Sequence, residues 1–220
     1  VIAKLTSTLV GMVDVKQDVT TDSIVDNCRA AASGNIKNIQ HPFEGLTRIT
    51  GGVKRGMVTI LTGRSKSGKS MYKSFWQKHL GLIGTPTLDM CFEDGIEIAR
   101  MRCASIGKFC SSDLMNGGRY VKVGDKWEWW KNTEDDISKM EKALRELDTL
   151  PMYWHERRVA PNNLLSTVSE YVNRHKIECV FIDGAKDMLR PSGKYNDCGF
   201  EEETSQTIVD MAQRLNIAVV

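Results

Sequence analysis

The chain has 220 residues, enough for one large domain or two small ones. A composition of 41% hydrophobic and 26% charged residues excludes a disordered tail, a collagen-like fibre and a heptad rod. Thirty basic against 28 acidic residues leave a net charge of +2, so any nucleic-acid contact must come from local placement of charge.

In the first half of the chain, short apolar runs alternate with helical patterns. The expected elements are a helix over 21–32, a loop over 35–55, a strand over 57–61, a helix from about 69 to 80, a strand over 87–92 and a helix over 96–106. Apolar strands of this kind are typically buried on both faces, which favours a parallel sheet.

The second half begins with an alternating pattern around Gly124-Asp125, which predicts a hairpin of 120–123 and 126–130. Thr133 begins a helix, with Asp136 in the capping-box position. The remaining elements are a short strand over 151–154, a helix over 161–174, a strand over 179–182, a helix over 204–215 and a strand over 217–220. The order predicts an α/β fold, a mainly parallel sheet flanked by helices on both faces, with a small inserted hairpin.

A complete phosphate-binding pattern, G-x-x-x-x-G-K-[ST], lies between the strand over 57–61 and the helix after it. Its glycines let backbone N–H groups surround a phosphate, and the helix directs its positive end at the same anion. Lys69 is expected to reach the β and γ phosphates, and the hydroxyl of Ser70 to ligate Mg²⁺. The expected nucleotide-binding residues are Gly63, Arg64, Ser65, Lys66, Ser67, Gly68, Lys69 and Ser70.

Two acidic residues follow apolar strands. Asp183 ends the strand over 179–182 and lies where ligands bind in parallel sheets, so we expect it to hold Mg²⁺ opposite Ser70. By itself Asp183 is equally an ordinary cap after a strand; the phosphate loop favours the metal. Glu93 follows the strand over 87–92 and is the expected general base, whereas Asp94 suits the start of the next helix.

The sequence from about Phe43 resembles the hexameric RecA-like replicative helicases, the DnaB, phage primase–helicase and Twinkle type. The resemblance rests on Phe43–Gly56, on the strand and phosphate loop over 57–70, on Met90–Glu93 with the helix after it, and on the order of elements that leads to Asp183. It implies a P-loop NTPase core in which Lys69, Glu93 and Asp183 are the catalytic residues.

The resemblance also implies the cofactors and partners. These are ATP or another NTP with Mg²⁺, single-stranded DNA, identical subunits in a ring expected to be a hexamer, and primase and polymerase as further partners. Residues 1–42 are expected to be a linker or helix segment and residues 43–220 the ATPase domain. The family continues beyond the last strand seen here, so we expect a piece of a longer protein.

Two other functions remain open. A RecA-type recombinase or DNA-repair ATPase would share the core and its site chemistry. A nucleotide-binding assembly module without hydrolysis would share the fold, although Lys69, Ser70, Glu93 and Asp183 argue against it.

Two segments are candidates for contacts with DNA. The hairpin places Tyr120, Lys122, Trp127 and Trp129 on one face, where they could stack on bases, but docking on the core or on a neighbouring subunit is favoured. The expected loop Arg190–Glu203 carries Arg190 and Lys194, against which stand the acids Asp197 and Glu201–Glu203.

No apolar run approaches the length that spans a bilayer, and residues 1–10 lack the basic start and apolar core of a signal peptide. Six cysteines include no Cys-x-x-Cys pair, which excludes a zinc ribbon. We expect no membrane partner and a protein that is not secreted, located in the cytoplasm, in a phage-infected cell or in an organelle matrix.

Overall fold

The computed structural model describes residues 22, 25–26, 29, 38–189 and 197–220. The chain divides into two units, Val1–Lys37 and Asn38–Val220, and the architecture below is that of the second unit. The helix expected over 21–32 falls mostly outside the described residues.

In the described part of this unit, a 4-stranded parallel sheet has the order β4-β1-β5-β6. The strands are β1 (Thr87–Cys91), β4 (Met152–His155), β5 (Cys179–Asp183) and β6 (Ala218–Val219). Every residue of β1 is buried, as expected for the centre of a parallel sheet. Because the strands are parallel, their carboxyl ends meet at one edge, where Cys91 lies opposite Asp183.

The strand expected over 57–61 does not form a regular strand. Val58 makes an isolated parallel bridge with Val219; the amide of Thr59 donates to Val219 O at 2.8 Å, and the amide of Val219 donates to Met57 O at 3.1 Å. The segment therefore extends the sheet beyond β6. Ile60 is 77% exposed, because this outer edge of the described sheet has less protein packed over it than β1 has.

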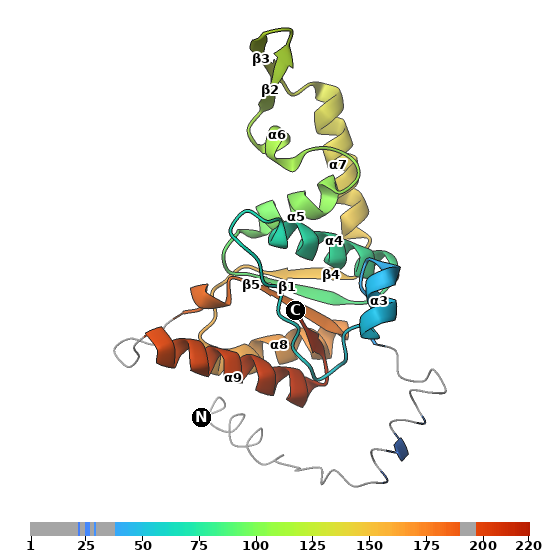
Figure 1. The fold of residues 1–220 in the computed structure, drawn as a ribbon, viewed down its shortest axis with the longest axis vertical. Coiled ribbons are helices and arrows are strands. Elements are labelled where there is room, and N and C mark those ends of the chain that lie inside the picture. Colours follow the sequence, from blue (N-terminus) through green and yellow to red (C-terminus); the bar gives the residue numbers. More distant parts are fainter. Residues whose placement is uncertain (1–21, 23–24, 27–28, 30–37, 190–196) are drawn as a thin grey trace. The chain divides into compact units, whose positions relative to one another are not determined.

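Helices cover both faces of the sheet (Figure 1), as predicted. Trp76 and Leu80 of α4 (Lys69–Leu82) pack with Phe181 on one face. On the other face, a larger core joins β1 and β5 to two helices, α8 (Pro161–His175) and α9 (Asp197–Leu215). A third cluster joins α5 (Ile96–Ser105), α7 (Glu134–Asp148) and β4. The predicted capping box at Thr133 and Asp136 is present.

Two loops are shorter than the sequence predicts. The segment 35–55, expected to be a loop throughout, contains the short helix α3 (Glu44–Thr50), in which Thr50 Oγ1 donates to Leu46 O. The loop expected over 190–203 ends early, because α9 already begins at Asp197 and is held by the buried Phe200. Arg190 and Lys194 lie outside the described residues, so their role in binding DNA stays a prediction.

The predicted hairpin is present as β2 (Gly118–Val123) and β3 (Lys126–Lys131), next to the short helix α6 (Ser111–Met115). It projects away from the sheet and its covering helices (Figure 1). All residues of β3 are exposed. The favoured expectation that the hairpin docks on the core is therefore wrong, because the core is already closed by α4, α5 and α7, and only the alternative of a contact with another molecule remains.

Candidate active site

The phosphate loop joins the 57–61 segment to α4. Residues 62–68 are exposed, and Gly68 is the N-cap of α4 with φ +90°, a left-handed conformation that favours glycine. Lys66 also has a positive φ, +60°. No side chain caps the first turn of α4, so its backbone N–H groups remain available to an anion at the mouth of the loop.

Lys69 lies across this loop. Its ammonium donates hydrogen bonds to the carbonyl oxygens of Gly63 and Arg64, both at 3.0 Å. A Cβ on Gly63 would lie 2.7 Å from Ser67 Oγ, so only glycine allows the loop to close this tightly. The loop thus places one positive charge where the outer phosphates of a nucleotide would lie.

Glu93 and Asp183 are brought together at the carboxyl edge of the sheet. The amides of Phe92 and Glu93 donate to Asp183 O at 3.2 and 3.3 Å. Gly184 has φ +82°, and a Cβ there would lie 2.8 Å from Glu93 Cβ and 2.8 Å from Asp187 Oδ2. The side chain of Glu93 is exposed, as a general base that must meet water requires.

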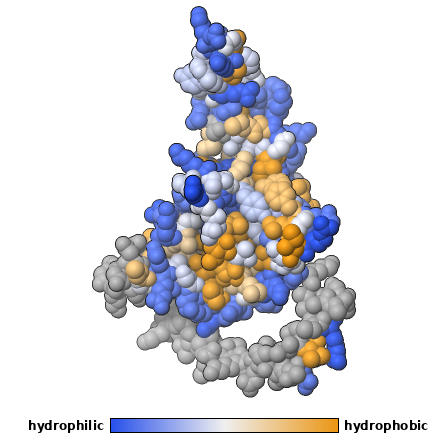
Figure 2. Space-filling view, viewed as in Figure 1, coloured by the Kyte–Doolittle hydropathy of each residue, from blue (hydrophilic) through white to orange (hydrophobic). Residues whose placement is uncertain are grey.

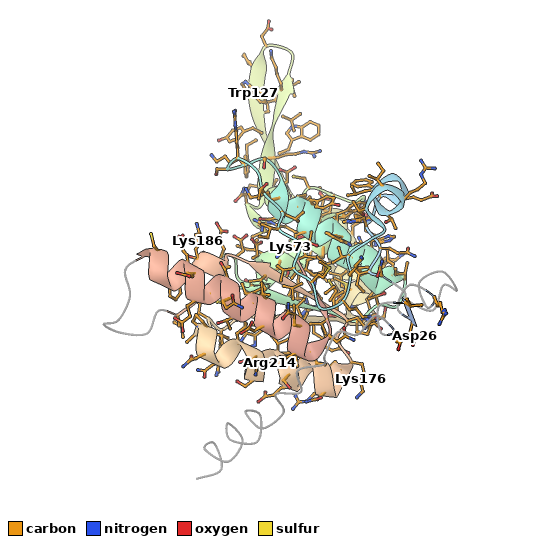
Figure 3. The ribbon with its side chains drawn as sticks, turned by 60° about the horizontal axis from the view of Figure 1, so that its bottom comes forward. Asp26, Lys73, Trp127, Lys176, Lys186 and Arg214 are labelled. Carbon is orange, nitrogen blue, oxygen red and sulfur yellow. The ribbon has the colours of Figure 1, made fainter. Side chains whose placement is uncertain are left out.

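A third basic residue, Lys73 of α4, joins the phosphate-loop helix to the acidic edge. Its Nζ donates to both carboxylate oxygens of Asp89, at 3.0 and 2.9 Å, and lies 3.1 Å from Asp183 Oδ2. Figure 3 shows Lys73 in the interior beside the sheet. Burial alone would lower the pKa of Lys73, but the two carboxylates outweigh it and raise the pKa, so the group is an ammonium.

The sequence analysis missed Lys73 and Asp89, although two signals pointed to them. Asp89 lies inside an otherwise apolar strand, where a carboxylate requires a charged partner. Lys73 follows Lys69 by one helical turn and is therefore on the same side of α4. Together with Asp183 the two residues form a cluster with one positive and two negative charges.

The residues present fit a bound Mg²⁺. Apart from its ion pair with Lys73, the buried Asp183 Oδ2 accepts no hydrogen bond from any described residue, which leaves this carboxylate oxygen able to take a cation. Ser70 lies one turn before Lys73 on α4 and supplies a second hard oxygen ligand. In the ranges described, no three His, Cys, Asp or Glu side chains are grouped to hold a metal by themselves. This agrees with Mg²⁺, which takes most of its ligands from phosphate and water.

Asp94 lies beside the catalytic candidates but has another partner. It forms an ion pair with Arg102 of α5. Asp94 precedes Gly95, the N-cap of α5, so it stands at the start of that helix, as the sequence indicated.

Comparison with known proteins identifies the fold. No protein-family model and no curated protein matches the sequence. Among solved structures, a DnaB-like replicative helicase, described with its interactions with primase, matches with a TM-score of 0.72 and 16% identity over 99% of this chain. The ATPase domain of a second helicase matches with a TM-score of 0.74 and 16% identity over 92% of this chain and 70% of its own.

These matches confirm the predicted fold class, a RecA-like ATPase core with a mainly parallel sheet between helices. They confirm the resemblance to DnaB-type helicases at the level of the fold. The chain spans 51% of the DnaB-like helicase, about half its length. None of the described helices is both long and apolar enough to cross a membrane.

Proposed function

We propose that this chain is the ATP-hydrolysing motor domain of a ring-shaped replicative DNA helicase. The observation that carries the proposal is the joining of α4 to the acidic sheet edge. Lys73, one turn beyond the phosphate loop, contacts Asp183, whose backbone in turn holds Glu93. Phosphate-binding, metal-binding and water-activating groups are thereby gathered at one edge of the sheet.

The proposed reaction is attack of water on the γ-phosphorus of ATP, with cleavage of the bond to the β,γ-bridging oxygen. Glu93 accepts the proton that the water loses. Lys69 and the backbone amides of the loop stabilise the charge on the phosphate oxygens, and ADP and phosphate leave. Mg²⁺, held by Ser70 and Asp183, would bridge and neutralise phosphate oxygens.

The partners we propose are identical subunits, single-stranded DNA, and primase and polymerase. They are supported by the fold shared with two helicase structures, one of which is described with its interactions with primase. ATP is proposed to bind between subunits, and its hydrolysis to drive movement along single-stranded DNA. The ring is proposed to be a hexamer.

Replacement of Lys69 tests the site. Lys69→Ala should lower ATP hydrolysis in the presence of single-stranded DNA by at least about 100-fold, since a charge that stabilises the transition state is lost. Lys142→Ala is the matched control, because Lys142 is an exposed lysine of α7. Hydrolysis by Lys69→Ala at the control's rate would overturn the assignment.

Two DNA assays on the full-length protein separate the proposed function from its alternatives. Unwinding of a forked duplex that depends on ATP supports a helicase, whereas strand exchange without unwinding supports a recombinase. A protein that binds ATP but does not hydrolyse it supports an assembly module.

A further inference from the structure

The hairpin formed by β2 and β3 leaves large aromatic side chains in solvent. Tyr120 is 66% exposed, Trp127 67%, Trp129 42% and Trp130 51%. Figure 3 shows Trp127 on the projecting ribbon, far from the sheet. Exposed rings gathered in this way are typical of interaction sites, since a soluble surface rarely leaves several of them uncovered.

The base of the hairpin is tied to α6 and the chain next to it. Asn132 Nδ2 donates to the carbonyl oxygens of Asp113 and Leu114, at 3.2 and 3.1 Å. Arg119 contacts the carboxylate of Asp113 at 3.4 Å. The exposed rings are therefore held on an anchored ribbon, because its base is bonded to a helix.

The two faces of the hairpin differ in chemistry. The pairs Tyr120–Trp129 and Lys122–Trp127 lie on one face, which we call the aromatic face, and Lys131 lies there too. Its charged residues, Lys122 and Lys131, are exposed and form no ion pair within the described residues. The opposite face carries Trp130, but also Glu128 and Arg119.

The rings of the aromatic face are arranged with one of them free. Trp129 contacts Tyr120 edge to face at 4.9 Å, and its ring lies over Gly118, where a Cβ would approach it to 2.9 Å. No ring in the described part of the chain stacks on Trp127. Trp127 and Trp129 are alternate residues of one strand, so their Cα atoms lie about 6.8 Å apart, twice the spacing of stacked bases.

We infer that the aromatic face binds single-stranded DNA, by stacking bases on Trp127 and Trp129 and contacting phosphates through Lys122 and Lys131. Bases stack on exposed aromatic rings, and unpaired lysines attract the phosphates between them. A protein partner would favour a larger aliphatic patch, whereas the hairpin is largely hydrophilic on the face in Figure 2. The choice of DNA over another nucleic acid rests on the proposed function.

The test measures binding of a fluorescein-labelled oligo(dT) to the full-length protein by anisotropy, without nucleotide. Trp127→Ala should weaken binding about 5- to 150-fold, the usual effect of losing one stacking ring. Trp127→Phe should restore much of the affinity. Trp130→Ala is the matched control, because it removes an equally exposed ring from the opposite face of the same ribbon, and it should leave binding unchanged.

Two further measurements separate stacking from charge. A backbone of the same length without bases should bind wild type and Trp127→Ala equally, because only the lysines contact it. Lys122→Gln should weaken binding and reduce its dependence on salt. Equal affinity of wild type and Trp127→Ala for oligo(dT) would overturn the inference. If Trp127→Ala instead impaired self-association alone, the face would be a contact between subunits.

Failure of this inference is distinguishable from failure of the proposed function. The binding assay contains no ATP, so loss on Trp127→Ala supports the inference even in a protein that does not hydrolyse ATP. Conversely, Lys69→Ala can abolish hydrolysis while Trp127→Ala binds DNA normally, which would leave the motor assignment standing and remove the hairpin from it.

Discussion

The ammonium of Lys73 lies between two carboxylates, 2.9 Å from Asp89 Oδ2 and 3.1 Å from Asp183 Oδ2. The side chain of Asp89 is wholly buried and that of Lys73 is 8% exposed. This contact is the physical link between the helix that follows the phosphate loop and the strand that ends in the proposed metal ligand. Its charges also hold the interior together, because each carboxylate is neutralised only in part.

Removal of this ammonium should destabilise the fold. Lys73→Met leaves the buried Asp89 without a counter-charge, and breaking a buried pair from one side costs about 3–5 kcal/mol of unfolding free energy. Urea unfolding at neutral pH measures the loss. Lys142→Met, an exposed substitution, should stay within about 0.5 kcal/mol of wild type. The double variant Lys73→Met/Asp89→Leu should recover part of the loss, and a single variant as stable as wild type would contradict the role of the pair.

Loss of the proposed base should separate hydrolysis from binding. Glu93→Gln keeps the size of the side chain but accepts no proton, so ATP hydrolysis should fall about 10²- to 10⁴-fold. Nucleotide affinity, measured with a fluorescent ATP analogue, should change little. Glu97→Gln, on the exposed side of the first turn of α5, is the control and should hydrolyse ATP as wild type does. Retained hydrolysis in Glu93→Gln would assign the base to another residue.

A methyl group on Gly184 should displace that base without touching it chemically. A Cβ at this position would meet Glu93 Cβ at 2.8 Å and Glu93 N at 3.1 Å. Because a displacement of about 1 Å can cost 10²-fold in rate, Gly184→Ala should lower the rate of ATP hydrolysis far more than nucleotide affinity. Gly107→Ala, at φ +74° with nothing within 4 Å of the added Cβ, supplies the backbone strain without the clash. Equal hydrolysis rates in the two variants would contradict this account.

The fold should lose stability in mild acid through His155. Burial lowers the pKa of His155, whose Nδ1 lies 3.3 Å from Tyr171 Oη. The unfolded chain takes up this proton near pH 6.5, whereas the folded chain does so only at lower pH. The stability contribution is therefore intact above about pH 6.5 and is lost as the pH falls through the folded-state value.

Thermal unfolding of wild type and His155→Gln at a series of pH values measures this effect. The difference between the two melting temperatures should shrink or reverse from about pH 7 to pH 5, because the variant has no imidazole to protonate. Carboxylates titrate in both proteins and cancel in the difference. Melting curves that shift in parallel over this range would remove His155 from the acid sensitivity.

Much of the site follows from the sequence because its signals are local. The glycines and Lys69 of the phosphate loop act over eight consecutive positions, Gly63–Ser70, and each of Glu93 and Asp183 follows directly on an apolar strand. The same holds for the hairpin and for the capping box at Thr133, where the spacing of a few residues defines the structure. Such patterns need no knowledge of distant contacts.

Other features were decided only by tertiary structure. The segment over 57–61 has the composition of a strand but pairs only at Val58, because its place is at the outer edge beside β6. Residues 197–203 are helical because Phe200 is buried in the core, against the local signals of Gly199 and the acids. Whether the hairpin rings pack on the core or face solvent depends on which surfaces the helices have already covered.

The sequence by itself determined the nucleotide chemistry, since Lys69, Ser70, Glu93 and Asp183 are specified by short patterns and by strand ends. Only the tertiary structure decided what surrounds these groups. Lys73 and Asp89 are 16 positions apart in the chain, and nothing in their separate segments pairs them until α4 packs on the sheet. A buried charge can be placed only when its partner is known, and that partner comes from packing between elements rather than from neighbouring residues.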